Sequence, residues 1–262
     1  MRLEAADLAI GYGRTRVGSG IHVAVAPGEV LALLGPNGCG KTTLFRTLMG
    51  LLPAQGGEVR LGGERLGTLS RAAIARRIGY VPQHAEGYFP FTVLETVLMG
   101  RTAHTGIFST PSRQDYAVAR AHLERLGMAD YAEQPFTRIS GGQRQLTLIA
   151  RALTQEASIL VMDEPTASLD FGNELRVLDR IRRLAADGHA VVLSTHNPDH
   201  ADRYADRIAV MHDGGIIAQG SPGAVLTGEL LSGIYDVAVE RAPVATSAPG
   251  PRVHVTLPRG TL

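Results

Sequence analysis

Residues 30–51 limit the fold of this chain more strongly than any other segment. They read VLALL, then the glycine-rich run GPNGCGK, then a stretch in which leucines recur at helical spacing. A buried strand that passes through a tight turn into a helix is the building unit of α/β domains. Two more short apolar strands, at 159–163 and 190–195, are joined to helix-like segments. The sequence therefore predicts an α/β fold with a mixed, largely parallel sheet.

Antiparallel strands and helices are predicted outside this pattern. The segments 56–66 and 207–220 carry glycine pairs between apolar runs, which indicates hairpins of an antiparallel β subdomain at the edge of the core. Residues 85–155 contain helix-like stretches and no convincing strand, so we expect a helical insertion subdomain there. Residues 237–262 lack periodicity, which predicts a loosely held C-terminal extension. We expect a single domain at 1–236, with its core at about 1–84 and 156–236.

Composition and charge exclude several classes of protein. With 262 residues, 44% of them apolar, the chain can bury a sizeable core, so a disordered or fibrous protein is excluded. A formal charge of +1 gives no bulk attraction for nucleic acid, and we expect no nucleic-acid partner. Cys39 is the single cysteine, no apolar leader is evident, and the apolar runs are far shorter than the roughly 20 residues that span a bilayer. We expect a cytosolic chain that does not cross the membrane.

The glycine-rich turn has the pattern of a phosphate-binding loop. Of the 26 basic residues, 25 are arginine and one is Lys41, which indicates a position where a compact ammonium is required. Backbone N–H groups of such a loop surround phosphates, the lysine reaches the terminal phosphates, and the hydroxyl of Thr42 binds Mg²⁺. A plain strand-to-helix turn is the alternative, but it would not need the lysine. The predicted nucleotide-binding residues of the loop are Gly35, Pro36, Asn37, Gly38, Cys39, Gly40, Lys41, Thr42 and Thr43.

Two further motifs carry polar groups suited to phosphate chemistry. Asp163 and Glu164 end the apolar strand ILVMD, where one carboxylate can hold Mg²⁺ and the other can orient or deprotonate water. Two solvated acids at the start of a loop are the alternative. The segment Ser140, Gly141, Gly142, Gln143 precedes an amphipathic helix, so it is either a capping box alone or a capping box that also approaches an anion.

Together these motifs resemble an ATP-binding-cassette (ABC) ATPase. After the phosphate loop, YVPQ, ISGGQ, ILVMDEP, SLD and STH occur in the family's order, at 80–83, 139–143, 159–165, 168–170 and 194–196. The resemblance covers about residues 3–235 and implies a P-loop NTPase with a RecA-like core. Ile139 replaces the family's usual leucine. The glycine-rich stretch 17–25 also departs from the family, and we expect this edge to be loosely packed.

The resemblance implies a role for each motif residue. Tyr12 corresponds to the aromatic residue that stacks on adenine, and Asp163 to the Mg²⁺ ligand. Gln83 corresponds to a glutamine that senses Mg²⁺ and the terminal phosphate. Glu164 and His196 correspond to the catalytic carboxylate and the histidine that contacts that phosphate, so the implied catalytic residues are Glu164, His196 and Gln83. The implied metal site comprises Thr42, Gln83 and Asp163. Ser140, Gly141, Gly142, Gln143 and Asp170 would act on ATP across a dimer, and the implied cofactors are ATP and Mg²⁺.

The resemblance also implies partners. Such ATPases work as head-to-tail homodimers bound to transmembrane permease subunits on the inner face of the membrane, and an extracytoplasmic binding protein supplies the substrate. The segments 91–101, 167–174 and 220–237 resemble importers of metal chelates, which favours iron-siderophore uptake over molybdate, zinc, haem or cobalamin. An exporter or a non-transport ABC ATPase are the alternatives. A GTPase is excluded because its guanine motif needs a second lysine.

Overall fold

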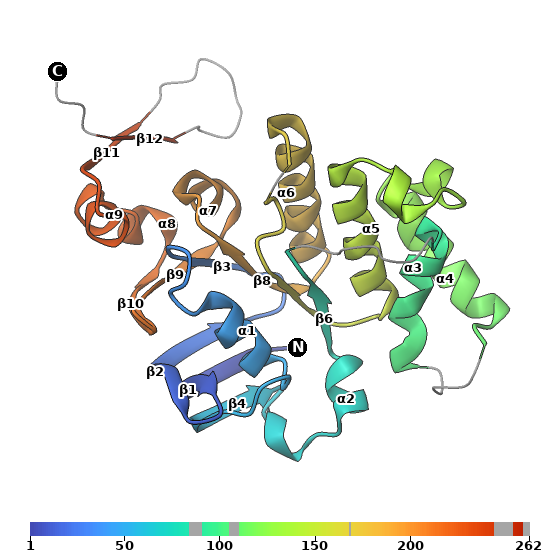
Figure 1. Ribbon diagram of the computed structural model, residues 1–262, viewed down its shortest axis with the longest axis horizontal. Coiled ribbons are helices and arrows are strands. Elements are labelled where there is room, and N and C mark those ends of the chain that lie inside the picture. Colours follow the sequence, from blue (N-terminus) through green and yellow to red (C-terminus); the bar gives the residue numbers. More distant parts are fainter. Residues whose placement is uncertain (84–90, 105–109, 168, 244–253, 259–262) are drawn as a thin grey trace.

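The computed structural model describes residues 1–83, 91–104, 110–167, 169–243 and 254–258. A six-stranded sheet forms its centre, in the order β10-β9-β3-β8-β7-β6. The strands pair in parallel except that β10 runs antiparallel to β9. The prediction of a largely parallel α/β sheet is therefore confirmed (Figure 1). The bounds are β3 Val30–Leu34, β6 Ile78–Val81, β7 Ile159–Met162, β8 Ala190–Thr195, β9 Arg207–His212 and β10 Gly215–Gly220.

Strand β3 shows how the central sheet joins two hydrophobic layers. Its side chains point alternately to opposite faces of the sheet. Val30, Ala32 and Leu34 belong to the core cluster on the face covered by helices α5 (Gly141–Thr154) and α6 (Phe171–Ala186). Leu31 and Leu33 belong to the cluster that contains the apolar residues of helix α1 (Lys41–Leu48). All five residues are buried because both faces of a parallel sheet are covered.

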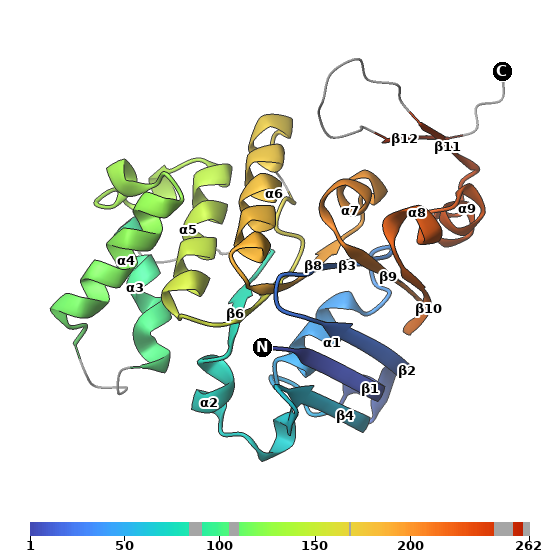
Figure 2. The ribbon, with the colours of Figure 1, turned by 180° about the vertical axis from the view of Figure 1, so that it is seen from behind.

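An antiparallel sheet of four strands packs on α1 and forms a separate layer (Figure 2). Its order is β2-β1-β4-β5, and each neighbouring pair is antiparallel, as the glycine pairs at 56–66 predicted. The second predicted hairpin, at 207–220, is β9 and β10, which extend the central sheet instead. The bounds are β1 Leu3–Tyr12, β2 Thr15–Val25, β4 Gly56–Leu61 and β5 Glu64–Arg65.

The expectation of loose packing at 17–25 is wrong. Strand β2 covers the whole of this stretch, and Ile21 and Val25 are fully buried. A Cβ atom on Gly18 would lie 1.9 Å from the carbonyl oxygen of Gly214 in the turn between β9 and β10. Glycine is thus required because two backbones touch here, and the antiparallel sheet is tied tightly to the central one.

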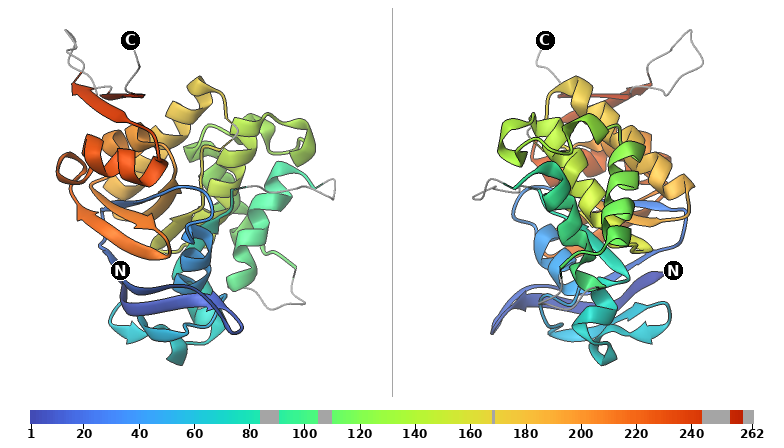
Figure 3. Two further views of the ribbon diagram at one scale, coloured as in Figure 1. Left: turned by 60° about the vertical axis from the view of Figure 1, so that its left-hand side comes forward. Right: turned by 90° about the vertical axis from the view of Figure 1, so that its right-hand side faces the viewer.

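Helices form the described part of residues 91–155 and stand beside the central sheet (Figure 3). No strand is assigned to the described residues of this segment, although Thr92 and Pro135 form an isolated bridge. The guanidinium of Arg101 joins the helices: it donates to Asp115 Oδ1 at 2.8 Å and to the carbonyl oxygen of Thr154 at 3.0 Å. The predicted start of this subdomain at residue 85 lies outside the described residues.

The remaining elements complete the chain. Two strands, β11 and β12, pair antiparallel where the sequence analysis expects a loosely held extension, and they lie at the end of the molecule opposite β1 and β2 (Figures 1 and 3). In the ranges that the structure describes, no helix combines the length and hydrophobicity needed to span a membrane. The other bounds are α1 Lys41–Leu48, α2 Arg71–Ala75, α3 Val93–Leu98, α4 Arg113–Arg125, α5 Gly141–Thr154, α6 Phe171–Ala186, α7 Pro198–Tyr204, α8 Pro222–Val225, α9 Gly228–Tyr235, β11 Val239–Pro243 and β12 His254–Pro258, with 3₁₀ turns at Leu66–Thr68, Met99–Ala103, Ala129–Tyr131 and Phe136–Arg138.

Candidate functional site

The loop between β3 and α1 curls around the side chain of Lys41. Gly38 and Gly40 have φ angles of 82° and 112°, a region that favours glycine, and Gly40 is the N-cap of α1. The ammonium Nζ of Lys41 donates to the carbonyl oxygens of Gly35 and Pro36, at 2.8 and 2.9 Å. The loop therefore presents the N-terminus of α1 and a buried cation at the same place.

A cavity of about 410 Å³ opens over this loop. Gly35, Pro36 and Cys39 are not part of its lining: Cys39 is buried, and burial raises the pKa of its thiol. Gln83 and Glu164 close the cavity from the ends of β6 and β7. Most of the predicted loop residues thus face one space, together with Val17, which the sequence analysis did not single out. The lining residues are Val17, Asn37, Gly38, Gly40, Lys41, Thr42, Thr43, Gln83 and Glu164.

Asp163 is a buried carboxylate that is held by two hydroxyl groups. Thr42 Oγ1 donates to its Oδ2 atom at 2.8 Å, and Ser194 Oγ donates to its Oδ1 atom at 2.7 Å. The three residues come from α1, the end of β7 and β8, so the adjacency depends on the parallel pairing of the strands. Mg²⁺ prefers one or two carboxylates, with waters and substrate phosphates as further ligands. The carboxylate and hydroxyl of Asp163 and Thr42 are a donor set that fits this ion.

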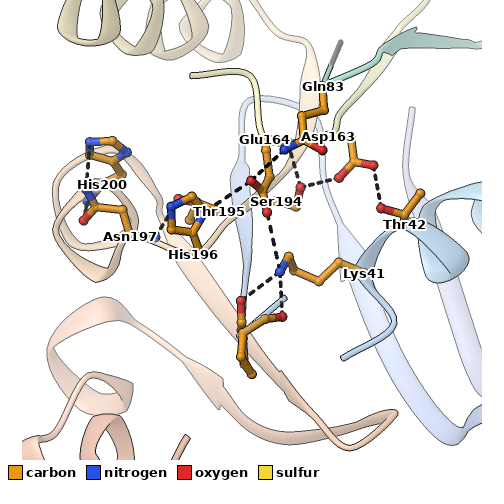
Figure 4. Close-up of polar contacts among 12 residues, drawn as sticks. Lys41, Thr42, Gln83, Asp163, Glu164, Ser194, Thr195, His196, Asn197 and His200 are labelled. Carbon is orange, nitrogen blue, oxygen red and sulfur yellow. Dashed lines mark hydrogen bonds and ion pairs between the residues drawn. The ribbon is translucent and has the colours of Figure 1, made fainter. Parts of the chain in front are cut away.

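Glu164 occupies the centre of the polar network (Figure 4). Its φ of 42° is unusual for a residue other than glycine, and its backbone N–H donates to Ser194 Oγ at 2.8 Å. Its Oε2 atom accepts from Gln83 Nε2 at 3.1 Å and lies 3.2 Å from His196 Nδ1. Its Oε1 atom lies 3.6 Å from Nζ of Lys41. The structure therefore brings the three predicted catalytic side chains together.

Ser194 is a site residue whose role the sequence analysis did not assign. Its hydroxyl is fully buried and connects the carboxylate of Asp163 to the backbone of Glu164. A polar residue near the end of the apolar strand 190–195 was the available signal. The hydroxyl of Tyr235, in α9, donates to the carbonyl oxygen of His196 at 2.8 Å, and no spacing in the sequence indicated that contact.

Tyr12 lies at the rim of the site. The residue is 43% exposed, and its hydroxyl lies 3.4 Å from Thr43 Oγ1 and from a guanidinium nitrogen of Arg46. Tyr12 does not line the cavity over the phosphate loop. An exposed ring beside such a cavity can offer a face for a planar base.

The predicted signature residues lie apart from the phosphate loop. Ser140 caps α5 in a capping box with Gln143, so both side chains are used within their own helix end. Gly142 packs on Asn173, because a Cβ at Gly142 would lie 2.7 Å from that side chain. Asn173 in turn donates its backbone N–H to Asp170, the N-cap of α6, while Gly141 is the exposed first residue of α5. None of the five predicted residues, which are Ser140, Gly141, Gly142, Gln143 and Asp170, lines the cavity over the phosphate loop. Ser168, in the predicted SLD motif, lies outside the described residues.

The sequence is similar to curated proteins and to solved structures. The model of the family described as ABC transporter matches residues 19–167. The chain is 40% identical over 240 residues to a cobalamin import ATP-binding protein, BtuD, of Halobacterium salinarum, covering 91% of this chain and 60% of that protein. It is 36% identical to the ferric enterobactin transport ATP-binding protein FepC of Escherichia coli, with coverages of 89% and 87%.

A solved structure extends the similarity to the whole fold. It is a chain of an ABC transporter described as metal-chelate type, in an inward-facing conformation. The TM-score is 0.86 and the sequence identity 31%, covering 97% of this chain and 96% of that one. The match includes the antiparallel sheet and the helical segment as well as the central sheet, because it leaves only 3% of this chain uncovered.

Proposed function

The chain belongs to the ATP-binding subunits of the ABC transporter family, and we propose that it powers import of a metal chelate of the iron-siderophore type through a separate permease. The observation that carries the proposal is the network in which Lys41, Asp163 and Glu164 meet over the phosphate loop. The cargo class is supported by the similarity to FepC and to the metal-chelate transporter. Similarity to BtuD favours cobalamin as the second candidate cargo.

The phosphate loop would hold the triphosphate of ATP. The first residues of α1 line the cavity, so the free backbone N–H groups and the dipole of this helix end would attract an anion there. Lys41 would exchange its carbonyl partners for oxygens of the terminal phosphates. Thr42 and Asp163 would hold Mg²⁺, which supplies charge neutralisation to the phosphates when it is bound. Tyr12 would stack on adenine.

Glu164 would orient and deprotonate the attacking water. Gln83 and His196 contact the same carboxylate oxygen of Glu164, its Oε2 atom. Both side chains would therefore fix the orientation of the Glu164 carboxylate toward the water. In that arrangement the water would lie between Glu164 and the terminal phosphate. His196 would then contact the transferred phosphoryl group.

Two copies of the chain would be needed for a complete site. Ser140, Gly141, Gly142, Gln143 and Asp170 lie away from the phosphate loop of their own chain. In a head-to-tail homodimer the exposed end of α5 would face the ATP held by the other copy. ATP binding would favour the closed dimer and hydrolysis the open one, which is a population shift driven by a ligand.

A second groove, which lies between the end of α1, helix α2 and the helical segment, would receive the permease. It has a volume of about 440 Å³ and combines apolar side chains with two arginines, Arg71 and Arg151. An amphipathic helix that lays its apolar face into such a groove is a common recognition mode. Burial lowers the pKa of Arg151, and among the described residues no carboxylate pairs with it. The docking segment would therefore carry an acidic group. Bound to the permease in this way, the chain would reside at the inner face of the membrane. The groove is lined by Met49, Gly50, Leu51, Arg71, Ile74, Ala75, Ile78, Tyr80, Met99, Gly100, Arg151 and Gln155.

Purification of the complex from native membranes tests the proposal. Tagged Glu164→Gln chain, held in Mg-ATP, is recovered from mildly solubilised membranes and its partners are identified by mass spectrometry. The proposal predicts a permease with several membrane spans, and deletion of that permease should abolish uptake of radiolabelled ferric siderophore. Labelled cobalamin uptake in the same cells serves as the comparison. Recovery of soluble or nucleic-acid-bound partners alone would contradict the transport role.

A further inference from the structure

The phenol of Tyr235 contacts the backbone next to the polar network of the site. Tyr235 is the last residue of α9, more than 60 residues beyond the segment that matches the family model. Its hydroxyl donates to the carbonyl oxygen of His196 at 2.8 Å. We infer that Tyr235 is a positioning residue for ATP hydrolysis, which holds the peptide of His196 so that its imidazole faces Glu164; this inference rests on the proposed role of His196.

The position of His196 depends on polar contacts rather than on packing. Its side chain is 57% exposed, whereas the Glu164 side chain that it contacts is only 10% exposed. Strand β8 ends at Thr195 and α7 begins at Pro198, so His196 lies in the short connection between them. An exposed ring on a connection is held only by the groups that fix its backbone and by the partner of its ring.

Two hydrogen bonds fix the backbone on the other side of His196. Asn197 donates its backbone N–H to Thr195 Oγ1 at 3.0 Å, and its side chain caps α7 by accepting from the N–H of Asp199 at 2.9 Å. Within the part of the chain that the structure describes, the hydroxyl of Tyr235 is the hydrogen-bond partner of the His196 carbonyl oxygen. Loss of that hydroxyl would free the peptide to rotate and would move the imidazole away from Glu164.

Helix α9 is anchored well enough to serve as the support for this contact. Leu231 and Ile234 are buried in the larger core cluster, and the ring of Tyr235 packs against the same cluster. Thr227 caps the helix by accepting from the N–H of Leu230. Burial, with the nearby Cys39 and Glu164, raises the pKa of the Tyr235 phenol, so the hydroxyl remains a donor across the physiological pH range.

A double-mutant cycle on the full chain tests the inference. Tyr235→Phe keeps the packed ring and removes the donor, so kcat for Mg-ATP should fall about 3- to 10-fold, as expected for one lost hydrogen bond. The KM for ATP should stay within about twofold because the phosphate loop is untouched. In a His196→Ala background, Tyr235→Phe should cause no further loss. Tyr116→Phe, which alters an exposed tyrosine on α4, is the matched control.

The outcomes separate the inference from the proposed role of His196. A histidine-selective ¹⁵N spectrum should show a changed Nδ1 shift for His196 in Tyr235→Phe and not in Tyr116→Phe, which a purely structural role would not produce. Wild-type kcat in Tyr235→Phe, or an equal loss with and without His196, would overturn the inference alone. Wild-type kcat in His196→Ala would remove the proposed role of His196 and the inference with it.

Discussion

The ammonium Nζ of Lys41 lies 3.6 Å from Oε1 of Glu164, and the two side chains are only 6% and 10% exposed. The same ammonium donates to two loop carbonyl oxygens, so these three polar contacts are all with oxygen atoms. Buried charges require such partners because their desolvation is costly. In the proposed function, phosphate oxygens would replace these acceptors without leaving the lysine unpaired, so the pair would connect nucleotide binding to the position of Glu164.

Replacing Lys41 should strongly weaken nucleotide binding. Lys41→Ala removes the cation in the loop and leaves Glu164 without its buried counter-charge, so ATP affinity should fall at least about 30-fold, equivalent to roughly 2 kcal/mol. Lys41→Arg should lose most of the affinity too, because the guanidinium is too large for the space between two carbonyl groups. Titration calorimetry with ATP measures both. Unchanged affinity in Lys41→Ala would contradict the assigned phosphate loop.

The hydroxyl of Ser194 should matter as much as a predicted site residue. Ser194→Ala leaves the backbone N–H of Glu164 without its acceptor and removes one of the two hydroxyl groups that donate to the carboxylate of Asp163. We expect the ATPase rate to fall about 10- to 100-fold and stability to drop by about 1–3 kcal/mol. ATPase assays over a range of Mg²⁺ concentrations, with urea unfolding, provide the measurement. Ser70→Ala, which removes an exposed cap of α2, should keep its ATPase rate.

The contact between Gly18 and Gly214 should tolerate no side chain. Gly18→Ala would place a Cβ atom 1.9 Å from a backbone oxygen, which no rotamer can relieve, so we expect a loss of about 3 kcal/mol or more. Gly67→Ala, where nothing lies within 4 Å, should change stability by less than about 0.5 kcal/mol. Urea unfolding compares the two. Equal stability would show that the sheets are not in contact at Gly18.

The acid end of the stability curve should depend on Asp115. Hydrogen bonds from Ser112, followed by the bond from Arg101, lower the pKa of Asp115 from 3.8 to about 2. Because the folded pKa lies below the unfolded value, this contribution is complete above pH 4 and is lost as the pH falls toward 2. Thermal unfolding should therefore show Asp115→Asn less stable than wild type at pH 6, and the difference should shrink below pH 4. Glu124→Gln, exposed on the same helix, should show no such change. A difference that stays constant with pH would contradict the assigned ion pair.

The parts that could be predicted from the sequence are those determined by local patterns. The turn at 35–42 is one continuous segment, so its glycines and Lys41 identify it without knowledge of the rest of the fold. The strands predicted at 159–163 and 190–195 are short apolar runs, and parallel pairing places their ends at one edge of the sheet. Their proximity to Thr42 follows from the fold class alone.

The parts that could not be predicted depend on contacts between distant segments. A glycine in a strand can weaken the strand or can permit another backbone to approach closely. At Gly18 only the position of Gly214 in the folded structure shows that the second explanation applies. The contact of Tyr235 with His196 joins an α9 residue to a connection 39 residues earlier, and no periodicity encodes it. The sequence showed Ser194 only as one residue of an apolar strand. Its role could not be predicted because its partners, Asp163 and Glu164, follow a different strand.

Light scattering on the Glu164→Gln chain tests whether ATP is hydrolysed between two copies of the chain. In the proposed mechanism, Glu164 deprotonates the water that attacks this ATP. The variant should therefore bind ATP, hydrolyse it at least about 100-fold more slowly than wild type, and elute as a dimer of twice the 27.8 kDa chain mass in Mg-ATP. Without nucleotide it should elute as a monomer. A monomer that hydrolyses ATP at the wild-type rate would contradict the account.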